Sequence, residues 1–193
     1  MQFASKNKWF YRRSLKPSKR IKLGFNNLFV FPNKYGLYWI FSSLLIYILG
    51  TNLEVNITIL ISYLMIVILI INLFLTHFNL HGLELHSSKQ NISFAKTKIK
   101  YYINLKSSFA RNNIKLKFIN EDFKPLHLIK TNGEISEYIY INEKHRGIFD
   151  PGIIYGKSSA PMSLFNCWFY WRPFNKIIVA PNYKSHLEYF NYK

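Results

Sequence analysis

The sequence contains little cysteine and little negative charge. Cys167 is the single cysteine among 193 residues, so no intrachain disulfide can form, which is typical of a protein that folds in a reducing compartment. Asp and Glu number 9 against 26 Lys and Arg, which gives a formal net charge of +17. This balance favours nucleic acid or an anionic membrane as a partner, but a general enrichment in Lys, Asn, Ile, Tyr and Phe explains much of it equally well. The positions of the charges are therefore more informative than their number.

Charge of either sign is absent from two long apolar stretches, residues 35–53 and 57–75. A bilayer core of roughly 30 Å requires roughly 20 helical residues, so each stretch is long enough to cross it. Glu54 and a few neutral residues separate the two, which predicts a tight transmembrane hairpin over residues 35–76. The alternative is a buried helical pair in a soluble protein, and it is disfavoured because neither stretch has a polar face.

Positive charge is concentrated before the first apolar stretch. Residues 1–34 contain nine Lys and Arg and no acidic residue, whereas the turn of the hairpin has no Lys or Arg. The positive-inside rule then predicts a multi-pass membrane protein with both chain ends in the cytoplasm. Residues 1–34 are interpreted as a basic juxtamembrane tail on the anionic inner leaflet. The side chains predicted at this membrane interface are Arg12, Arg13, Lys19, Arg20, Lys22, Lys34, Tyr38 and Trp39.

After Thr76 the pattern changes to an alternation of apolar and polar residues. Between residues 98 and 106 the apolar positions are Ile99, Tyr101, Ile103 and Leu105, and the neighbours between them are mostly polar. Residues 114–118 and 137–143 repeat the alternation. A period of two predicts strands with one buried face.

Turn signals separate these strands and suggest a complete sheet domain. They lie at residues 111–113, 131–133 and 150–152, and further strands are expected near residues 80–86, 153–155 and 176–180. Residues 77–182 are therefore predicted to form a cytoplasmic antiparallel β-sandwich of immunoglobulin-like size. A C-terminal tail over residues 183–193 follows. The expected fold class is an α+β membrane protein, a two-helix transmembrane hairpin followed by this sandwich.

An aromatic run, APMSLFNCWFYW, falls where a late strand of the sandwich is expected. It is too short to cross a bilayer. Alternation places Phe165, Cys167 and Phe169 on one face and Trp168 and Tyr170 on the other. A core strand is the leading interpretation, with contact to a partner or to the membrane as the alternative.

Catalytic chemistry is not predicted from this sequence. His77 and His81 are four residues apart with His86 close behind, but no cysteine or carboxylate completes a metal site. Cys167 lies in an apolar run and is expected to be a packed thiol. No phosphate-binding glycine loop, nucleophile elbow or zinc-protease helix is present. We therefore expect no catalytic, cofactor-binding or metal-binding residues.

A basic face is expected on the sandwich, and a specific nucleic-acid partner is not. No recognised nucleic-acid motif accompanies the basic residues. A solvated face is the leading interpretation, and electrostatic docking of a partner is the second. The lysines expected to line one solvent-facing sheet are Lys98, Lys100, Lys106, Lys115 and Lys117.

The order of several short motifs resembles a bacterial membrane-protein family, the one catalogued as domain of unknown function 58. The first motif is FPNKYGLYWI, a proline-to-glycine turn into the first apolar stretch, and the second is THFNLHGLEL after the hairpin. An Arg-Gly pair and the segment PMSLFNCW follow, and Val179 and Pro181 close the series. The matching positions in the later motifs are Asn79, Leu80, Gly82, Leu83, Arg146, Gly147, Pro161, Leu164, Phe165 and Trp168. Ser163 stands where the family usually has glycine, and the chain matches only the anchor and sandwich half of the family.

The resemblance implies a non-enzymatic adaptor at the cytoplasmic face of the bacterial inner membrane. Such proteins accompany MoxR-type AAA+ ATPases and transglutaminase-like membrane proteins, and a role in protein assembly is suggested for them. The predicted contact with a partner is the edge formed by Arg146, Gly147, Pro161, Leu164, Phe165 and Trp168. The alternative is a structural protein that binds anionic lipid through its basic tail and has no ATPase partner. A homo-oligomer is compatible with either.

Overall fold

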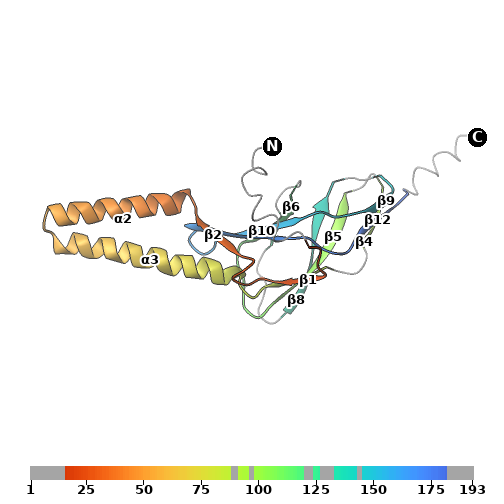
Figure 1. Ribbon diagram of the computed structural model, residues 1–193, viewed down its shortest axis with the longest axis horizontal. Coiled ribbons are helices and arrows are strands. Elements are labelled where there is room, and N and C mark those ends of the chain that lie inside the picture. Colours follow the sequence, from red (N-terminus) through yellow and green to blue (C-terminus); the bar gives the residue numbers. More distant parts are fainter. Residues whose placement is uncertain are drawn as a thin grey trace, which may run out of the picture.

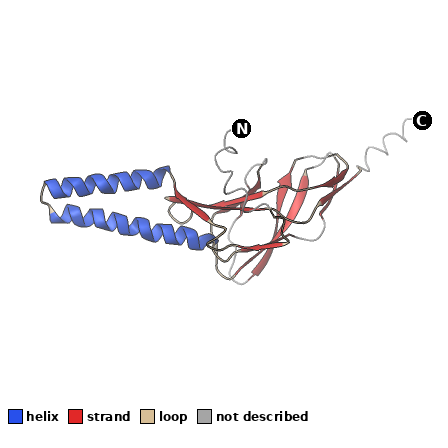
Figure 2. Ribbon diagram, in the orientation of Figure 1, coloured by secondary structure: helices blue, strands red, loops and turns tan. Residues whose placement is uncertain are grey.

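The chain folds into a body of β-strands from one end of which two helices project side by side (Figures 1 and 2). The computed structural model describes residues 16–87, 91–95, 98–119, 124–126, 133–142 and 145–181. Helix α2 spans Lys34–Asn52 and helix α3 spans Asn56–Leu80. Both helices predicted from the charge-free stretches are present. Helix α3 continues beyond residue 75, so the boundary expected at residues 76–77 lies inside the helix.

Local chemistry accounts for the ends of the helices. The side chain of Asn33 accepts a hydrogen bond from the backbone N–H of Lys34 and caps the start of α2. Glu54, with φ 54°, forms the turn between the helices. Gly82 has φ 78° and follows the last turn of α3, a conformation that favours glycine and turns the chain back toward the sheets.

The strands form three sheets, of four, five and three strands. In order across the sheet, the four-stranded one contains β1 (Arg20–Lys22), β3 (Glu84–Ser87), β5 (Ile99–Ser107) and β8 (Gly133–Ile141). The five-stranded one contains β2 (Phe29–Pro32), β11 (Phe165–Trp171), β10 (Ile154–Ser158), β6 (Ile114–Phe118) and β7 (Lys124–Leu126). The small sheet contains β4 (Asn91–Phe94), β12 (Ile177–Ala180) and β9 (Gly147–Phe149).

The core lies between the inner faces of the two larger sheets. Strand β5 buries every second residue from Ile99, and β6 does the same from Ile114. The rings of Tyr101 on β5 and Phe118 on β6 meet edge to face across the core, with centroids 5.5 Å apart. The predicted alternation is therefore confirmed on these strands, and the β-sandwich architecture with it.

The aromatic run supplies β11, an interior strand of the five-stranded sheet. Phe165, Cys167 and Phe169 are buried on β11, while Trp168 and Tyr170 are partly exposed on its other face. The strand pairs with β10 on one side and with β2 on the other. The prediction of a core strand is confirmed.

Three expectations about the sheets are wrong. The presumed juxtamembrane tail supplies β1 and β2, because Leu23 and Leu28 are buried in the core on either side of a turn. The predicted region 77–182 is not purely antiparallel, since β4 and β12 of the small sheet run parallel, whereas the named strands of the two larger sheets all pair antiparallel. Finally, the basic residues do not share one sheet: Lys100 is on β5 and Lys117 on β6, so they lie on two different sheets.

Candidate functional site

The buried residues of the helical hairpin are mostly small or polar, whereas most of its large apolar side chains are exposed. In α2 the buried residues are Gly36, Ser43 and Gly50, and in α3 they are Ser62, Asn72, Thr76 and Leu80. Leu44, Leu64 and Phe74 are each more than half exposed, as are many other apolar side chains of the hairpin. The buried hydroxyl groups form hydrogen bonds within their own helix, since Ser62 and Thr76 donate to its backbone carbonyls. This distribution is the reverse of that in a helix packed on an aqueous protein surface.

The two helices differ in composition. Within the described residues, α3 is the one helix whose length and apolar composition suffice to cross a membrane. Helix α2 is less apolar because tyrosines, serines and glycines interrupt its leucines and isoleucines.

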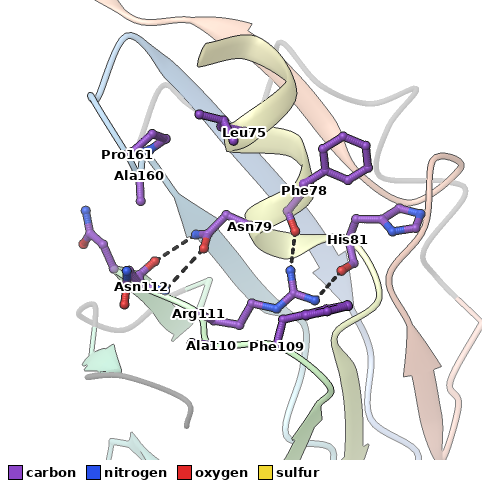
Figure 3. Close-up of a pocket in the computed structure, with 11 residues that line it drawn as sticks. Leu75, Phe78, Asn79, His81, Phe109, Ala110, Arg111, Asn112, Ala160 and Pro161 are labelled. Carbon is purple, nitrogen blue, oxygen red and sulfur yellow. Dashed lines mark hydrogen bonds between the residues drawn. The ribbon is translucent and has the colours of Figure 1, made fainter. Parts of the chain in front are cut away.

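A pocket of about 740 Å³ lies at the foot of α3, where the helix meets the sandwich (Figure 3). It is enclosed by the last turns of α3, the loop of residues 109–113 and the segment around Pro161. Leu75 and Phe78, one turn apart on α3, are apolar lining residues, and the ring of Phe109 lies beside Arg111, with its centroid 5.8 Å from the guanidinium carbon. The polar side is formed by Asn79, His81, Arg111, Asn112 and Asn113. We call these two groups of residues the apolar wall, on α3, and the polar wall of the pocket.

Arg111 joins the loop of this pocket to the end of α3. Its guanidinium donates to the carbonyl oxygens of Phe78 and His81, and its Nε donates to Ser107 Oγ at 2.9 Å. The side chain is 4% exposed. Burial lowers the pKa of Arg111, but an arginine stays protonated at any physiological pH. A buried cation at a helix C-terminus is stabilised because the last carbonyls carry partial negative charge.

Asn79, in the last turn of α3, also connects the helix to the sandwich. Its Nδ2 donates to the carbonyl oxygen of Asn112 at 2.8 Å and to Ser158 Oγ at 2.7 Å. Its Oδ1 accepts from the backbone N–H of Asn112. The last turn of α3 is therefore bonded to both the loop and strand β10, which fixes the helix to the body.

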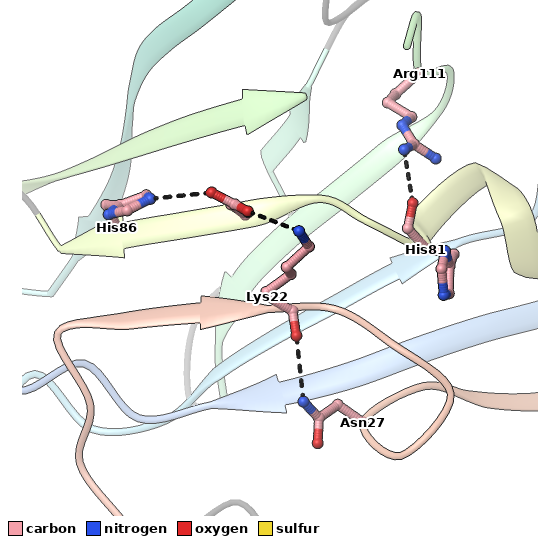
Figure 4. A network of polar contacts seen from close by, with 6 residues as sticks. Lys22, Asn27, His81, His86 and Arg111 are labelled. Atoms are coloured by element: carbon pink, nitrogen blue, oxygen red, sulfur yellow. Dashed lines mark hydrogen bonds and ion pairs between the residues drawn. The ribbon is translucent and has the colours of Figure 1, made fainter. Parts of the chain in front are cut away.

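A second polar network lies on the outer surface of β1 and β3 (Figure 4). Lys22 pairs with Glu84 at 3.2 Å, and His86 lies 3.7 Å from the other carboxylate oxygen. The hydrogen bond from Lys22 lowers the pKa of the Glu84 carboxyl. The groups are exposed or half-buried, so this network contributes little to stability.

The residues predicted at the membrane interface are divided between two places. Lys34, Tyr38 and Trp39 lie on the first turns of α2, where Tyr38 points outward and Trp39 donates its indole N–H to the carbonyl of Met65 in α3. Lys19, Arg20 and Lys22 lie in and beside β1, which pairs with β3 rather than forming a separate tail. The two remaining arginines, Arg12 and Arg13, lie outside the described residues.

The residues predicted as one partner-binding edge are not brought together. Arg146 and Gly147 are exposed at β9, at the end of the body away from the helices (Figure 1). Pro161 is exposed beside the pocket at the opposite end. The intervening members of the motif are mostly interior, because Leu164 and Phe165 are buried and Trp168 is partly covered by Phe29.

The groups considered for catalysis, Cys167, His77 and His81, are packed against neighbouring side chains. Burial raises the pKa of the Cys167 thiol to about 12, so the reactive thiolate is scarce at neutral pH. His77 and His81 lie with ring centroids 5.6 Å apart and Phe25 stacked on His77. Within the described part of the chain no three His, Cys, Asp or Glu side chains are grouped as metal ligands.

Sequence reasoning missed the junction at the foot of α3. Residues 111–113 were interpreted only as a turn, and Arg111 was assigned no role. A basic residue beside a turn gives no indication of a partner more than thirty residues earlier in the chain. Asn79 was noted as a motif position, and the structure gives it a bonding role.

Comparisons with known proteins give no analogue for this arrangement. No family model, no curated protein and no solved structure matches the chain. The function is therefore inferred from the geometry above and from the sequence motifs.

Proposed function

We propose that this protein is a non-enzymatic, membrane-anchored docking module at the cytoplasmic face of the bacterial inner membrane. Both helices of the hairpin insert in the bilayer and hold an immunoglobulin-like sandwich at its surface. The observation that carries this proposal is the reversed polarity of the hairpin, with Ser43, Ser62 and Asn72 inside and leucines and isoleucines outside. In lipid, small residues at a helix contact permit close packing, and outward apolar side chains are solvated by acyl chains.

The connections between helices and sandwich support a positioning role. Asn33 alone separates β2 from α2, and its backbone N–H donates to the carbonyl of Leu164 at 2.7 Å. Leu80, the last residue of α3, is fully buried in the core. Because neither connection contains a flexible linker, the sandwich is held in one orientation relative to the hairpin.

The small sheet is the surface best suited to a protein partner. Ile92, Ile148 and Ile178 are aligned on neighbouring strands by the register, and the first two are 69% and 67% exposed. This row lies beside Arg146, at the end of the body away from the helices (Figure 1). An exposed apolar patch with a cationic rim is typical of a docking surface. The sequence motifs favour a MoxR-type AAA+ ATPase as the partner, in a system that also contains a transglutaminase-like membrane protein.

A charge in the middle of α3 tests the anchor. Val67 lies near the centre of the helix and is 48% exposed. Val67→Asp places a carboxylate in the hydrocarbon, which is expected to lower the membrane-integrated fraction about tenfold after alkaline carbonate washing. Val67→Ala, the uncharged control, is expected to stay in the membrane. Extraction of the wild-type protein by carbonate would contradict the anchor.

Crosslinking in native membranes tests the docking surface. The wild-type protein is expected to recover a MoxR-type AAA+ ATPase, and Ile148→Glu is expected to reduce that recovery about tenfold, because a buried interface charge is costly. Arg146→Ala is expected to reduce it less. Phe174→Glu, at an exposed aromatic residue outside the small sheet, is the control. Recovery of the chain and lipid alone would favour the structural alternative without an ATPase partner.

A further inference from the structure

We infer that the pocket at the foot of α3 binds one anionic phospholipid, with the phosphate on its polar wall and an acyl chain along its apolar wall. This inference rests on the proposed insertion of the hairpin. It adds a specific site to an anchor that otherwise requires only bulk lipid.

The polar wall carries positive charge without a balancing carboxylate. The described residues that line the pocket include Arg111 and no Asp or Glu. The ion pairs described elsewhere use Glu84 and Asp150, which are not in the lining. Arg111 is 4% exposed and its guanidinium is bonded to Phe78, His81 and Ser107, so it contributes a fixed positive charge to this wall. An anionic group is therefore the ligand that this wall complements.

Amide groups next to the arginine extend the donor set. Asn112 and Asn113 both line the pocket and are exposed, and the Nδ2 of Asn113 also donates to Ser159 Oγ at 3.4 Å. The backbone groups of Asn112 are bonded to Asn79, as Figure 3 shows, while its side-chain amide is directed to no described residue. Arginine binds phosphate oxygens through charge-assisted hydrogen bonds, and the NH2 group of an asparagine is a further donor.

The apolar wall distinguishes a lipid from a free anion. Leu75 and Phe78 are 49% and 52% exposed and lie one turn apart on α3 at the pocket. Leu75 and Phe78 continue the apolar outer face of α3, so this wall is continuous with the surface that faces the acyl chains. A soluble phosphate would leave these two side chains in water. A ligand with a phosphate at one end and a hydrocarbon chain at the other covers both walls.

The position of the pocket along α3 agrees with this assignment. The pocket is at the end of the helix where the apolar surface gives way to the sandwich, which is the level of the lipid phosphates if the hairpin spans the bilayer. Its volume of about 740 Å³ accommodates a headgroup and the beginning of a chain.

The test uses the full chain in nanodiscs of phosphatidylcholine with a minor fraction of phosphatidylglycerol. Ala110 is exposed and lines the pocket, and it makes no bond that holds the junction. Ala110→Glu places a carboxylate beside Arg111, and Ala110→Gln is its uncharged counterpart of equal size. After release into mild detergent, native mass spectrometry is expected to show phosphatidylglycerol retained by the wild type and by Ala110→Gln. Retention by Ala110→Glu is expected to be roughly tenfold lower because like charges repel.

Three results would overturn the inference. They are equal retention by both variants, equal retention of phosphatidylcholine and phosphatidylglycerol by the wild type, and displacement of the lipid by an equimolar amount of inorganic phosphate. Carbonate extraction of the same samples separates this inference from the anchor. If the wild type resists extraction and the pocket variants do not differ, the pocket assignment alone fails. If the wild type is extracted, both proposals fail.

Discussion

Replacing Arg111 with methionine is expected to lower the free energy of unfolding by about 4 kcal/mol. The methionine fills most of the space but donates nothing to the carbonyls of Phe78 and His81 or to Ser107. Hydrogen bonds to charged groups contribute about 1.5–3 kcal/mol each, and buried carbonyls left without donors carry a desolvation cost. The loop that carries Arg111 would then be held to the end of α3 mainly by the hydrogen bonds of Asn79 with Asn112.

The measurement is denaturant unfolding of the detergent-solubilised protein, followed by circular dichroism. Arg172→Met is the matched control, because Arg172 pairs with Asp150 at a half-exposed position and its loss is expected to cost about 1 kcal/mol or less. Arg111→Lys keeps the charge but loses the forked geometry, so an intermediate loss is expected. Equal losses for Arg111→Met and Arg172→Met would show that the buried guanidinium does not hold the junction.

The sequence predicted those parts of the fold that depend on a local period. On β5, Ile99, Tyr101 and Ile103 are buried as the alternation requires, because a strand fixes which side of the sheet each residue faces. The helices were predicted correctly because a long stretch without charged residues is compatible with few structures other than a helix. In both cases the information is contained in a few consecutive residues.

The parts that were missed depend on contacts between distant segments. Strands β1 and β2 were interpreted as a basic tail because charge and aromatic residues dominated the composition. A signal was available, since Ile21 and Leu23 alternate with Arg20 and Lys22, but three residues are too few to identify a strand without its partner β3. The pocket could not be predicted for the same reason, because its walls come from residues that meet only in the folded chain.

The close approach of α2 to the β10–β11 turn shows how strictly the hairpin is placed. A Cβ at Gly36 would overlap the carbonyl oxygen of Leu164, which is backbone and cannot move aside. In the same turn Ser163 has φ 58°, a left-handed conformation that favours glycine. This position therefore adopts the left-handed conformation although it is a serine. The motif PMSLFNCW therefore lies against the start of α2. Its buried residues Leu164 and Phe165 contribute to this packing and not to an exposed surface.

Replacing Phe169 with alanine is expected to destabilise the protein by about 4 kcal/mol. Phe169 is fully buried at the centre of β11, and its ring lies over Gly156 on the paired strand β10, where a Cβ would overlap it. Truncation removes the buried ring and leaves a cavity that the surrounding sheet can fill only in part.

The next residue supplies the control: Tyr170 faces the other side of the strand, is partly exposed and contacts Tyr155 at 5.2 Å between ring centroids. Tyr170→Ala is expected to cost about 1 kcal/mol in the same denaturant titration. If the two substitutions cost the same, or if Tyr170→Ala costs more, then the aromatic run is not organised around a core face, and its concentration of rings would have to be explained by a contact outside the sandwich.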